Sequence, residues 1–125
     1  MKNFLILIAV IIVVVCSLTP ITNFLIKKGF QNKDKPWAPV TVVTCARIQM
    51  LLMNTTATRP ALESSLTTFP NYPKRDKVHF WIALCYEKEK NNKAAKEWFE
   101  SFLIYWPQHI WADQARRHIA NLENQ

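Results

Sequence analysis

The sequence predicts an all-α protein in which one N-terminal transmembrane helix is followed by a short stack of helical hairpins and a C-terminal capping helix. Three observations predict it. The chain of 125 residues opens on an uncharged apolar segment, its prolines leave helix-sized intervals, and apolar residues recur at helical spacing within those intervals. A chain of this length holds one small domain besides the apolar segment.

The N-terminal segment is long and apolar enough to cross a bilayer. Lys, Arg, Asp and Glu are absent between residues 3 and 26, and residues 4–15 are wholly apolar. As a helix, residues 4–26 extend about 34 Å, against a hydrocarbon core of about 30 Å. Lys27 and Lys28 then end the segment. We therefore expect an uncleaved transmembrane helix, a signal anchor, over residues 1–28.

A cleaved signal peptide is the alternative to this anchor. Lys2 would be its basic start, residues 4–15 its apolar core and residues 15–17 a poor cleavage site. A lipoprotein signal ending at Cys16 fits less well, because a bulky residue stands where a small one is usual. The apolar character resumes at residue 21 before the basic stop, which favours the anchor.

The second half of the membrane segment carries polar side chains, and Pro20 removes one backbone donor there. In lipid, such side chains take up freed backbone groups or meet a partner helix. We therefore predict that Thr19, Thr22 and Asn23 form a membrane-helix contact with a partner.

Two patterns disagree on which side of the membrane the rest of the chain faces. Four lysines follow the segment between residues 27 and 35 and one precedes it, which favours the cytoplasm under the positive-inside rule. A short flank followed at once by an apolar core is instead typical of exported domains.

The segment after the anchor is polar and proline-containing. Pro36 and Pro39 break residues 29–41, so these residues are predicted to form a short extended linker that lifts the domain off the lipid. The linker leads to a domain over residues 42–125.

Three intervals of the domain are free of proline and long enough for helices, namely residues 40–59, 74–106 and 108–125. Residues 78–86 could also be a buried strand, but no turn signal follows them until residues 91–92, which favours a helix. Two apolar stripes at helical spacing support helices, and their members are Ala94, Ala95, Trp98, Phe99, Phe102 and Leu103, then Ala112, Ala115, Ile119 and Leu122.

The domain aligns with itself when it is shifted by 34 residues, which brings Pro73 onto Pro107 and Ala61 onto Ala95. With this period, the second copy resembles the tetratricopeptide repeat. The residues that carry the resemblance are Ile82, Ala83, Tyr86, Ala95, Phe99, Phe102 and Pro107. Residues 105–116 also resemble a stretch found in bacterial envelope members of that family, in the Tol-Pal coordinator and the barrel-assembly repeat lipoprotein.

The resemblance implies a short α-solenoid of about two tetratricopeptide-like hairpins plus a capping helix, and it favours the periplasmic side. It further implies that the first helix of each repeat lines a concave groove for a peptide or partner helix. The predicted groove residues are Val43, Ala46, Met50 and Met53 in the first repeat and Lys77, Phe80, Leu84, Glu87 and Lys88 in the second. The alternative is that the chain's own linker, membrane helix or C-terminal helix covers these side chains.

Composition and spacing argue against several kinds of chemistry. A single glycine cannot build a glycine-rich phosphate loop, and the three cysteines and three histidines lack metal-ligand spacing. The formal charge of +7 comes from scattered cations, so attraction to lipid explains it better than binding to nucleic acid. We expect no enzyme activity, no metal, no cofactor and no nucleic-acid partner.

These inferences converge on a single-pass membrane protein that acts by binding. We expect a non-catalytic adaptor, an accessory or assembly subunit of a membrane complex, whose partners are other proteins and the bilayer. The alternative is an exported periplasmic repeat factor, released by signal cleavage, that acts in envelope maintenance or as a chaperone.

Overall fold

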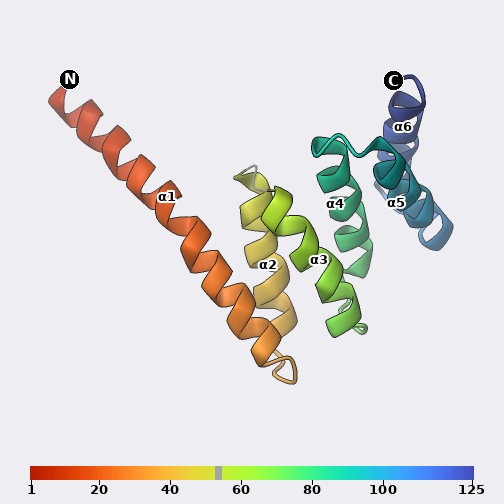
Figure 1. Cartoon of the computed structure of the whole chain (residues 1–125), viewed down its shortest axis with the longest axis horizontal. Coiled ribbons are helices and arrows are strands. Elements are labelled where there is room, and N and C mark those ends of the chain that lie inside the picture. Colours follow the sequence, from red (N-terminus) through yellow and green to blue (C-terminus); the bar gives the residue numbers. More distant parts are fainter. Residues whose placement is uncertain (53–54) are drawn as a thin grey trace.

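The computed structural model describes residues 1–52 and 55–125, and within them it is helical without strands. The described helices are α1 (Lys2–Gln31), α2 (Ala38–Leu51), α3 (Thr55–Thr68), α4 (Arg75–Lys88), α5 (Asn92–Tyr105) and α6 (Ala112–Glu123). Each helix packs mainly against its neighbours in sequence, which produces the row of helices in Figure 1. The all-helical prediction is confirmed, including a helix over residues 78–86.

The helices recur with a period of 37 residues. Helices α2, α4 and α6 begin at residues 38, 75 and 112, and helices α1, α3 and α5 end at residues 31, 68 and 105. Both series advance by 37 residues, so the period of 34 is wrong by three. Pro70 and Pro73 lie in the connection between α3 and α4, and Pro107 lies in the equivalent connection between α5 and α6. Proline spacing therefore fits both 34 and 37 residues and cannot distinguish them.

Burial repeats with the same period. Ala46 of α2 and Ala83 of α4 are 37 residues apart and both are fully buried. Leu62 of α3 and Phe99 of α5 are equally spaced and are also fully buried. Side chains at equivalent positions thus face the same way in successive hairpins, the small residue allowing close helix contact and the large one filling the interior.

A charged contact repeats as well. Arg59 of α3 lies 2.7 Å from Glu89, which caps the end of α4. Lys96 of α5, the equivalent of Arg59, lies 3.0 Å from Glu123 at the end of α6. In each hairpin, a cation on the second helix is thereby paired with a carboxylate at the end of the next helix in the row.

Aromatic side chains form the core between α4, α5 and α6. The ring centroid of Phe80 lies 5.4 Å from that of Phe99, 5.5 Å from that of Phe102 and 5.0 Å from that of Trp111. Ring pairs at these separations add stabilisation beyond the burial of their area. This core holds α4 and α6, two of the helices that border the candidate site, against α5.

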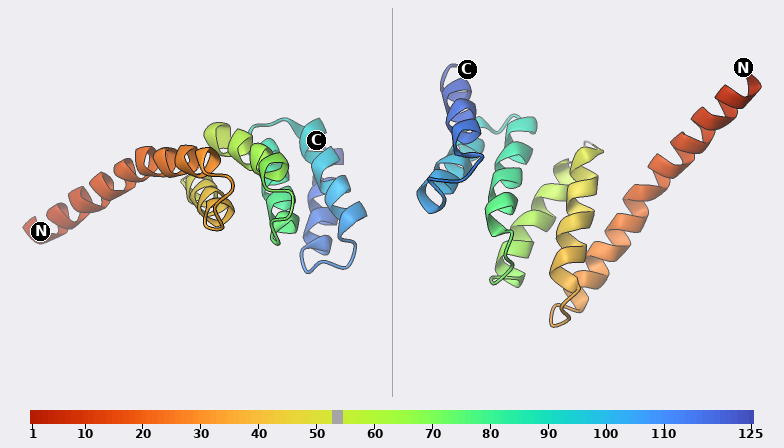
Figure 2. Two further views of the ribbon diagram at one scale, coloured as in Figure 1. Left: turned by 90° about the horizontal axis from the view of Figure 1, so that it is seen from below. Right: turned by 180° about the vertical axis from the view of Figure 1, so that it is seen from behind.

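Helix α1 is the one helix in the described residues that is long and apolar enough to cross a membrane. Its first half, residues 2–17, is exposed on all sides, and Figures 1 and 2 show it extending away from the other helices. Thr22, Ile26 and Gly29 in its second half are buried. The same helix therefore has a free apolar half and a half that packs against α2.

The predicted linker over residues 29–41 is wrong. Residues 29–31 complete α1 and residues 38–41 begin α2, which leaves only residues 32–37 as a turn. Gly29 explains the close packing that follows, because a Cβ there would lie 2.4 Å from Cγ2 of Val42. A tight helical hairpin, and not an extended spacer, joins α1 to the rest of the protein.

Candidate protein-binding groove

A groove of about 390 Å³ lies where α2, α4 and α6 meet. Its lining comes from these helices and from the residues that precede α4 and α6. The lining residues are Arg47, Lys74, Lys77, Phe80, Trp81, Leu84, Trp111 and Gln114. The second helices of the hairpins, α3 and α5, contribute no side chain to this lining, so the groove belongs to one face of the stack.

The period of 37 residues explains why these side chains share one surface. Lys74 and Trp111 occupy equivalent positions, and so do Lys77 and Gln114. Equivalent positions in stacked hairpins point in the same direction, so the groove continues from one hairpin to the next.

The groove is positively charged and has aromatic walls. Its lining holds three cationic side chains and no carboxylate. The guanidinium of Arg47 lies 4.9 Å from the ring centroid of Trp81, and Nζ of Lys77 lies 5.8 Å from that of Trp111. Such contacts stabilise a cation over an aromatic face by roughly 0.5–1 kcal/mol at exposed sites. The arrangement favours a ligand that combines negative charge with apolar surface.

Two carboxylates of α4 are engaged by histidines of the following elements. Oδ2 of Asp76 lies 2.7 Å from Nε2 of His109, and Oε2 of Glu87 lies 2.8 Å from Nδ1 of His118. Each contact is an ion pair when its histidine is protonated. These carboxylates therefore already have partners on the α6 side of α4.

Three of the five predicted groove residues of the second repeat line this groove. Lys77 and Leu84 line the groove, and Phe80 does so while remaining only 4% exposed. Glu87 is not among the lining residues and pairs with His118. Lys88 is exposed at the end of α4, outside the lining.

The predicted groove residues of the first repeat do not form an exposed surface. Val43, Ala46 and Met50 are buried in the core of the first four helices. The chain itself covers all three, but the alternative named only the linker, the membrane helix and the C-terminal helix, whereas the cluster that holds these side chains includes Leu62 of α3 and Val78 of α4 besides Ile26 of α1. Met53 lies outside the described residues.

Two of the predicted polar residues of α1, Thr22 and Asn23, contact α2 of the same chain. Nε2 of Gln49, a fully buried residue, donates to Oγ1 of Thr22 at 2.9 Å and to Oδ1 of Asn23 at 2.6 Å. The Thr22 hydroxyl also lies 2.9 Å from the backbone carbonyl of Thr19. Thr22 and Asn23 therefore have hydrogen-bonding partners within the chain, and their contact with a partner helix stays a prediction.

Arg47, Lys74, Trp81, Trp111 and Gln114 line the groove but were not predicted. A shift of 37 residues was the signal that could have found two of them. That shift places Arg47 on Leu84 and Gln114 on Lys77, and both Leu84 and Lys77 were predicted, whereas a shift of 34 residues places Met50 on Leu84.

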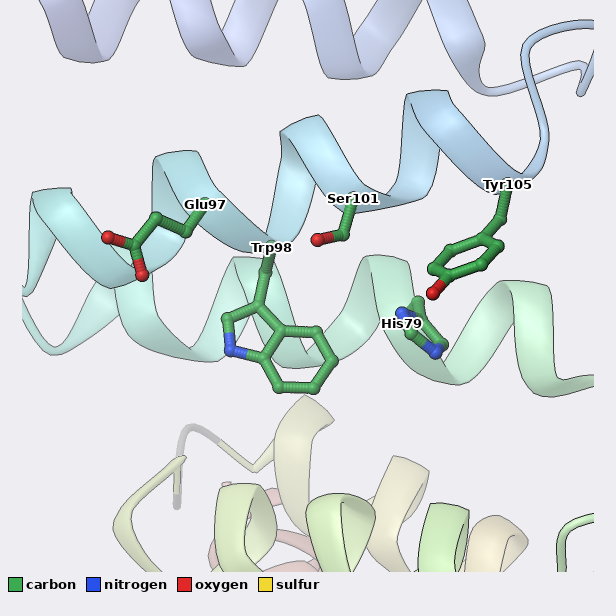
Figure 3. Close-up of a pocket in the computed structure, with 5 residues that line it drawn as sticks. All are labelled: His79, Glu97, Trp98, Ser101 and Tyr105. Atoms are coloured by element: carbon green, nitrogen blue, oxygen red, sulfur yellow. The ribbon is translucent and has the colours of Figure 1, made fainter.

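A second hollow lies between α4 and α5. His79 of α4 lies beneath side chains that follow one face of α5, among them Trp98, Ser101 and Tyr105 (Figure 3). Burial, together with the charge of Arg75, lowers the pKa of His79. Its Nδ1 is buried without a hydrogen-bond partner. Ser101 therefore makes no hydrogen bond to Nδ1 of His79, and these two side chains do not form a nucleophile–base pair through that nitrogen.

The sulfhydryl groups of the stack are buried. Cys45 and Cys85 are inaccessible, and burial raises the pKa of the Cys85 thiol to about 11. Within residues 1–52 and 55–125, His, Cys, Asp and Glu form no group of three that could hold a metal ion.

Comparison with known proteins gives no match to a protein-family model or to a curated protein. The groove and its attachment to α1 are therefore the basis on which a function is argued.

Proposed function

We propose that this protein is a membrane-anchored, non-catalytic adaptor that binds an acidic segment of a partner protein beside the bilayer. The observation that carries the proposal is the cationic, aromatic groove on a helical stack that joins α1 without a flexible linker. Such a protein acts as an accessory or assembly subunit that keeps its partner within a membrane complex.

The charge of the groove selects the partner. Arg47, Lys74 and Lys77 present positive charge, and carboxylates are absent from the lining. A partner segment with Asp or Glu side chains would form charge-assisted hydrogen bonds, which contribute about 1.5–3 kcal/mol each. Trp81 and Trp111 supply flat surfaces of the kind that dominate protein interfaces. A short acidic segment with one or two apolar side chains therefore fits best.

The recurring hairpins support a tetratricopeptide-like solenoid as the architecture of this adaptor. Its two hairpins are α2–α3 and α4–α5, and α6 serves as the cap. A repeat of 37 residues is longer than the 34 residues usual for the family. The extra length leaves a six-residue connection before each first helix, and these connections supply Lys74 and Trp111 to the groove.

Purification from detergent-solubilised membranes tests the proposal. We expect an acidic membrane-complex protein to co-purify with the wild-type chain and to dissociate as salt is raised, because salt screens exposed charges. The double variant Arg47→Glu, Lys77→Glu should lose this protein. The control is Arg116→Glu, Arg117→Glu, which makes the same change of charge on α6 outside the lining. Equal recovery of the acidic partner protein with the groove variant and with the control variant would contradict the proposal.

A periplasmic factor released by signal cleavage is the second candidate, and one observation favours it. The fully exposed part of α1 ends at residue 17, and the packed part begins at Leu18. Cleavage there would remove the free apolar half and leave the contact with α2 intact. The intact mass of the membrane-extracted protein separates the candidates, because a chain that starts near Leu18 would exclude the anchor.

A further inference from the structure

The free part of α1 is too short to cross a bilayer alone. Residues 2–17 extend about 24 Å at 1.5 Å per residue, against a hydrocarbon core of about 30 Å. The embedded segment must therefore include about four more residues, up to residue 21, and tilt of the helix would only add to this number. The next residue, Thr22, is already buried and bonded to Gln49 of α2.

This arithmetic places the C-terminal end of α2 at the level of the lipid headgroups. Leu51 ends α2, two residues after Gln49, and is 66% exposed. Figure 1 shows that the C-terminal end of α2, the α4–α5 turn and the end of α6 lie on the side of the stack toward which the free half of α1 extends. These three ends form the edge of the stack that faces the membrane.

The α4–α5 turn brings positive charge to this edge. Lys90 and Lys93 are exposed, and neither forms an ion pair within the described residues. Glu89, between Lys90 and the end of α4, is held by Arg59. Lys90 also has a φ of 64°, a backbone conformation that normally favours glycine. Strained residues of this kind cluster at functional positions, and a lysine beside an anionic lipid surface is attracted to it.

We propose that this edge rests on an anionic bilayer surface, with Leu51 inserted among the lipid chains and Lys90 and Lys93 against phosphate headgroups. The inference rests on the proposed membrane anchor. Because the α1–α2 hairpin has no flexible linker, contact at the edge fixes the orientation of the stack, and with it the direction in which the groove opens.

A lipid-exposed probe tests the inference in the full-length protein. The protein is reconstituted into vesicles of phosphatidylcholine with about 30% phosphatidylglycerol, an anionic content that gives a negative surface potential. A cysteine-reactive fluorophore is placed at Leu51→Cys in a Cys16→Ser background, and quenching by spin-labelled lipid is measured. The matched control is Val40→Cys, since Val40 is 53% exposed and lies three turns away on the same face of α2.

The inference predicts strong quenching at position 51 and little at position 40. The double variant Lys90→Glu, Lys93→Glu should reduce quenching at position 51 to its level in pure phosphatidylcholine vesicles. Equal, weak quenching at positions 51 and 40 in protein that floats with the vesicles would overturn the inference and leave the anchor standing. A chain that does not float with the vesicles would overturn the anchor itself, and the inference with it.

Discussion

Buried thiols in the stack give a prediction at the scale of single residues. The thiolate is the reactive form of cysteine, and burial raises the pKa of Cys85 to about 11 and also raises the pKa of Cys45. In a Cys16→Ser variant, neither thiol should react with a maleimide near neutral pH until the protein is unfolded. Mass spectrometry of the labelled protein measures this, and rapid labelling of Cys85 in the folded state would contradict the described packing.

His79 gives a prediction on pH and stability. Desolvation and Arg75 lower its pKa below the ordinary value of 6.5, so protonation favours the unfolded chain. Its contribution to the free energy of unfolding is present above about pH 6.5 and is lost as the pH falls below that value. The advantage of the wild type over His79→Gln should therefore shrink between about pH 8 and about pH 5. Denaturant unfolding at several pH values measures it, and an advantage that grows toward acid would contradict the burial of His79.

Some individual residues were predictable because their spacing alone determines the direction of the side chain. The apolar stripe that includes Phe99 and Phe102 marked a buried face, and both residues are fully buried. The partners of Thr22 and Asn23 were not predictable, because Gln49 is distant in sequence and its position depends on how α1 and α2 fold back on each other. Polar groups within an apolar segment indicate a need for hydrogen bonds and do not reveal which chain satisfies them.

At the scale of elements, the α1–α2 hairpin depends on close contact at Gly29. A Cβ in Gly29→Ala would lie 2.4 Å from Cγ2 of Val42, and valine has little rotamer freedom with which to move aside. The clash should cost roughly 1–3 kcal/mol, against a gain in helix propensity of about 1 kcal/mol. The free energy of unfolding of Gly29→Ala should therefore be lower than that of the wild type.

Restoration by a second substitution separates this effect from other causes. Gly29→Ala should be better tolerated in a Val42→Ala background, because the clashing methyl groups are absent there. Denaturant unfolding in detergent, followed by tryptophan fluorescence, gives the four free energies of the cycle. Additive effects of the two substitutions would show that the residues do not meet.

The equivalent charged contacts of α3 and α5 allow a comparison between hairpins. Arg59 lies 2.7 Å from Glu89 and 4.6 Å from the ring centroid of Tyr86, and it is partly buried. Arg59→Met should lower the free energy of unfolding by about 1 kcal/mol, discounted for partial exposure. Lys96→Met removes the equivalent but exposed pair and should have a smaller effect. Thermal unfolding of both variants measures this order, and the reverse order would contradict it.

The existence and type of the elements could be predicted from the sequence more readily than their boundaries. The interval over residues 40–59 was treated as one helix-sized unit, yet α2 ends at Leu51 and Pro60 lies inside α3. The two prolines of the connection before α4 also made the period ambiguous by three residues. A shift of that size is less than one helical turn but turns a helical face by about 60°, which led to Ala46 being placed in the groove.

At the scale of the whole molecule, the attachment of α1 to the stack determines what the groove can reach if α1 is the proposed anchor. An extended linker would let the stack move freely above the bilayer, whereas the tight turn over residues 32–37 holds it against α1. A long apolar helix followed by a helical domain was predictable from composition and periodicity. The packing of the second half of α1 against the stack was not, because it depends on contacts between α1 and α2.

Photo-cross-linking from the groove in native membranes tests the central claim most directly. A photoreactive amino acid at Leu84 lies within the groove, and the same amino acid at Ile104, which is 76% exposed on α5, serves as the control. We predict cross-links from position 84, and not from position 104, to an acidic segment of a membrane-complex protein. Cross-links confined to position 104, or a partner segment from position 84 that carries no acidic residues, would contradict the account.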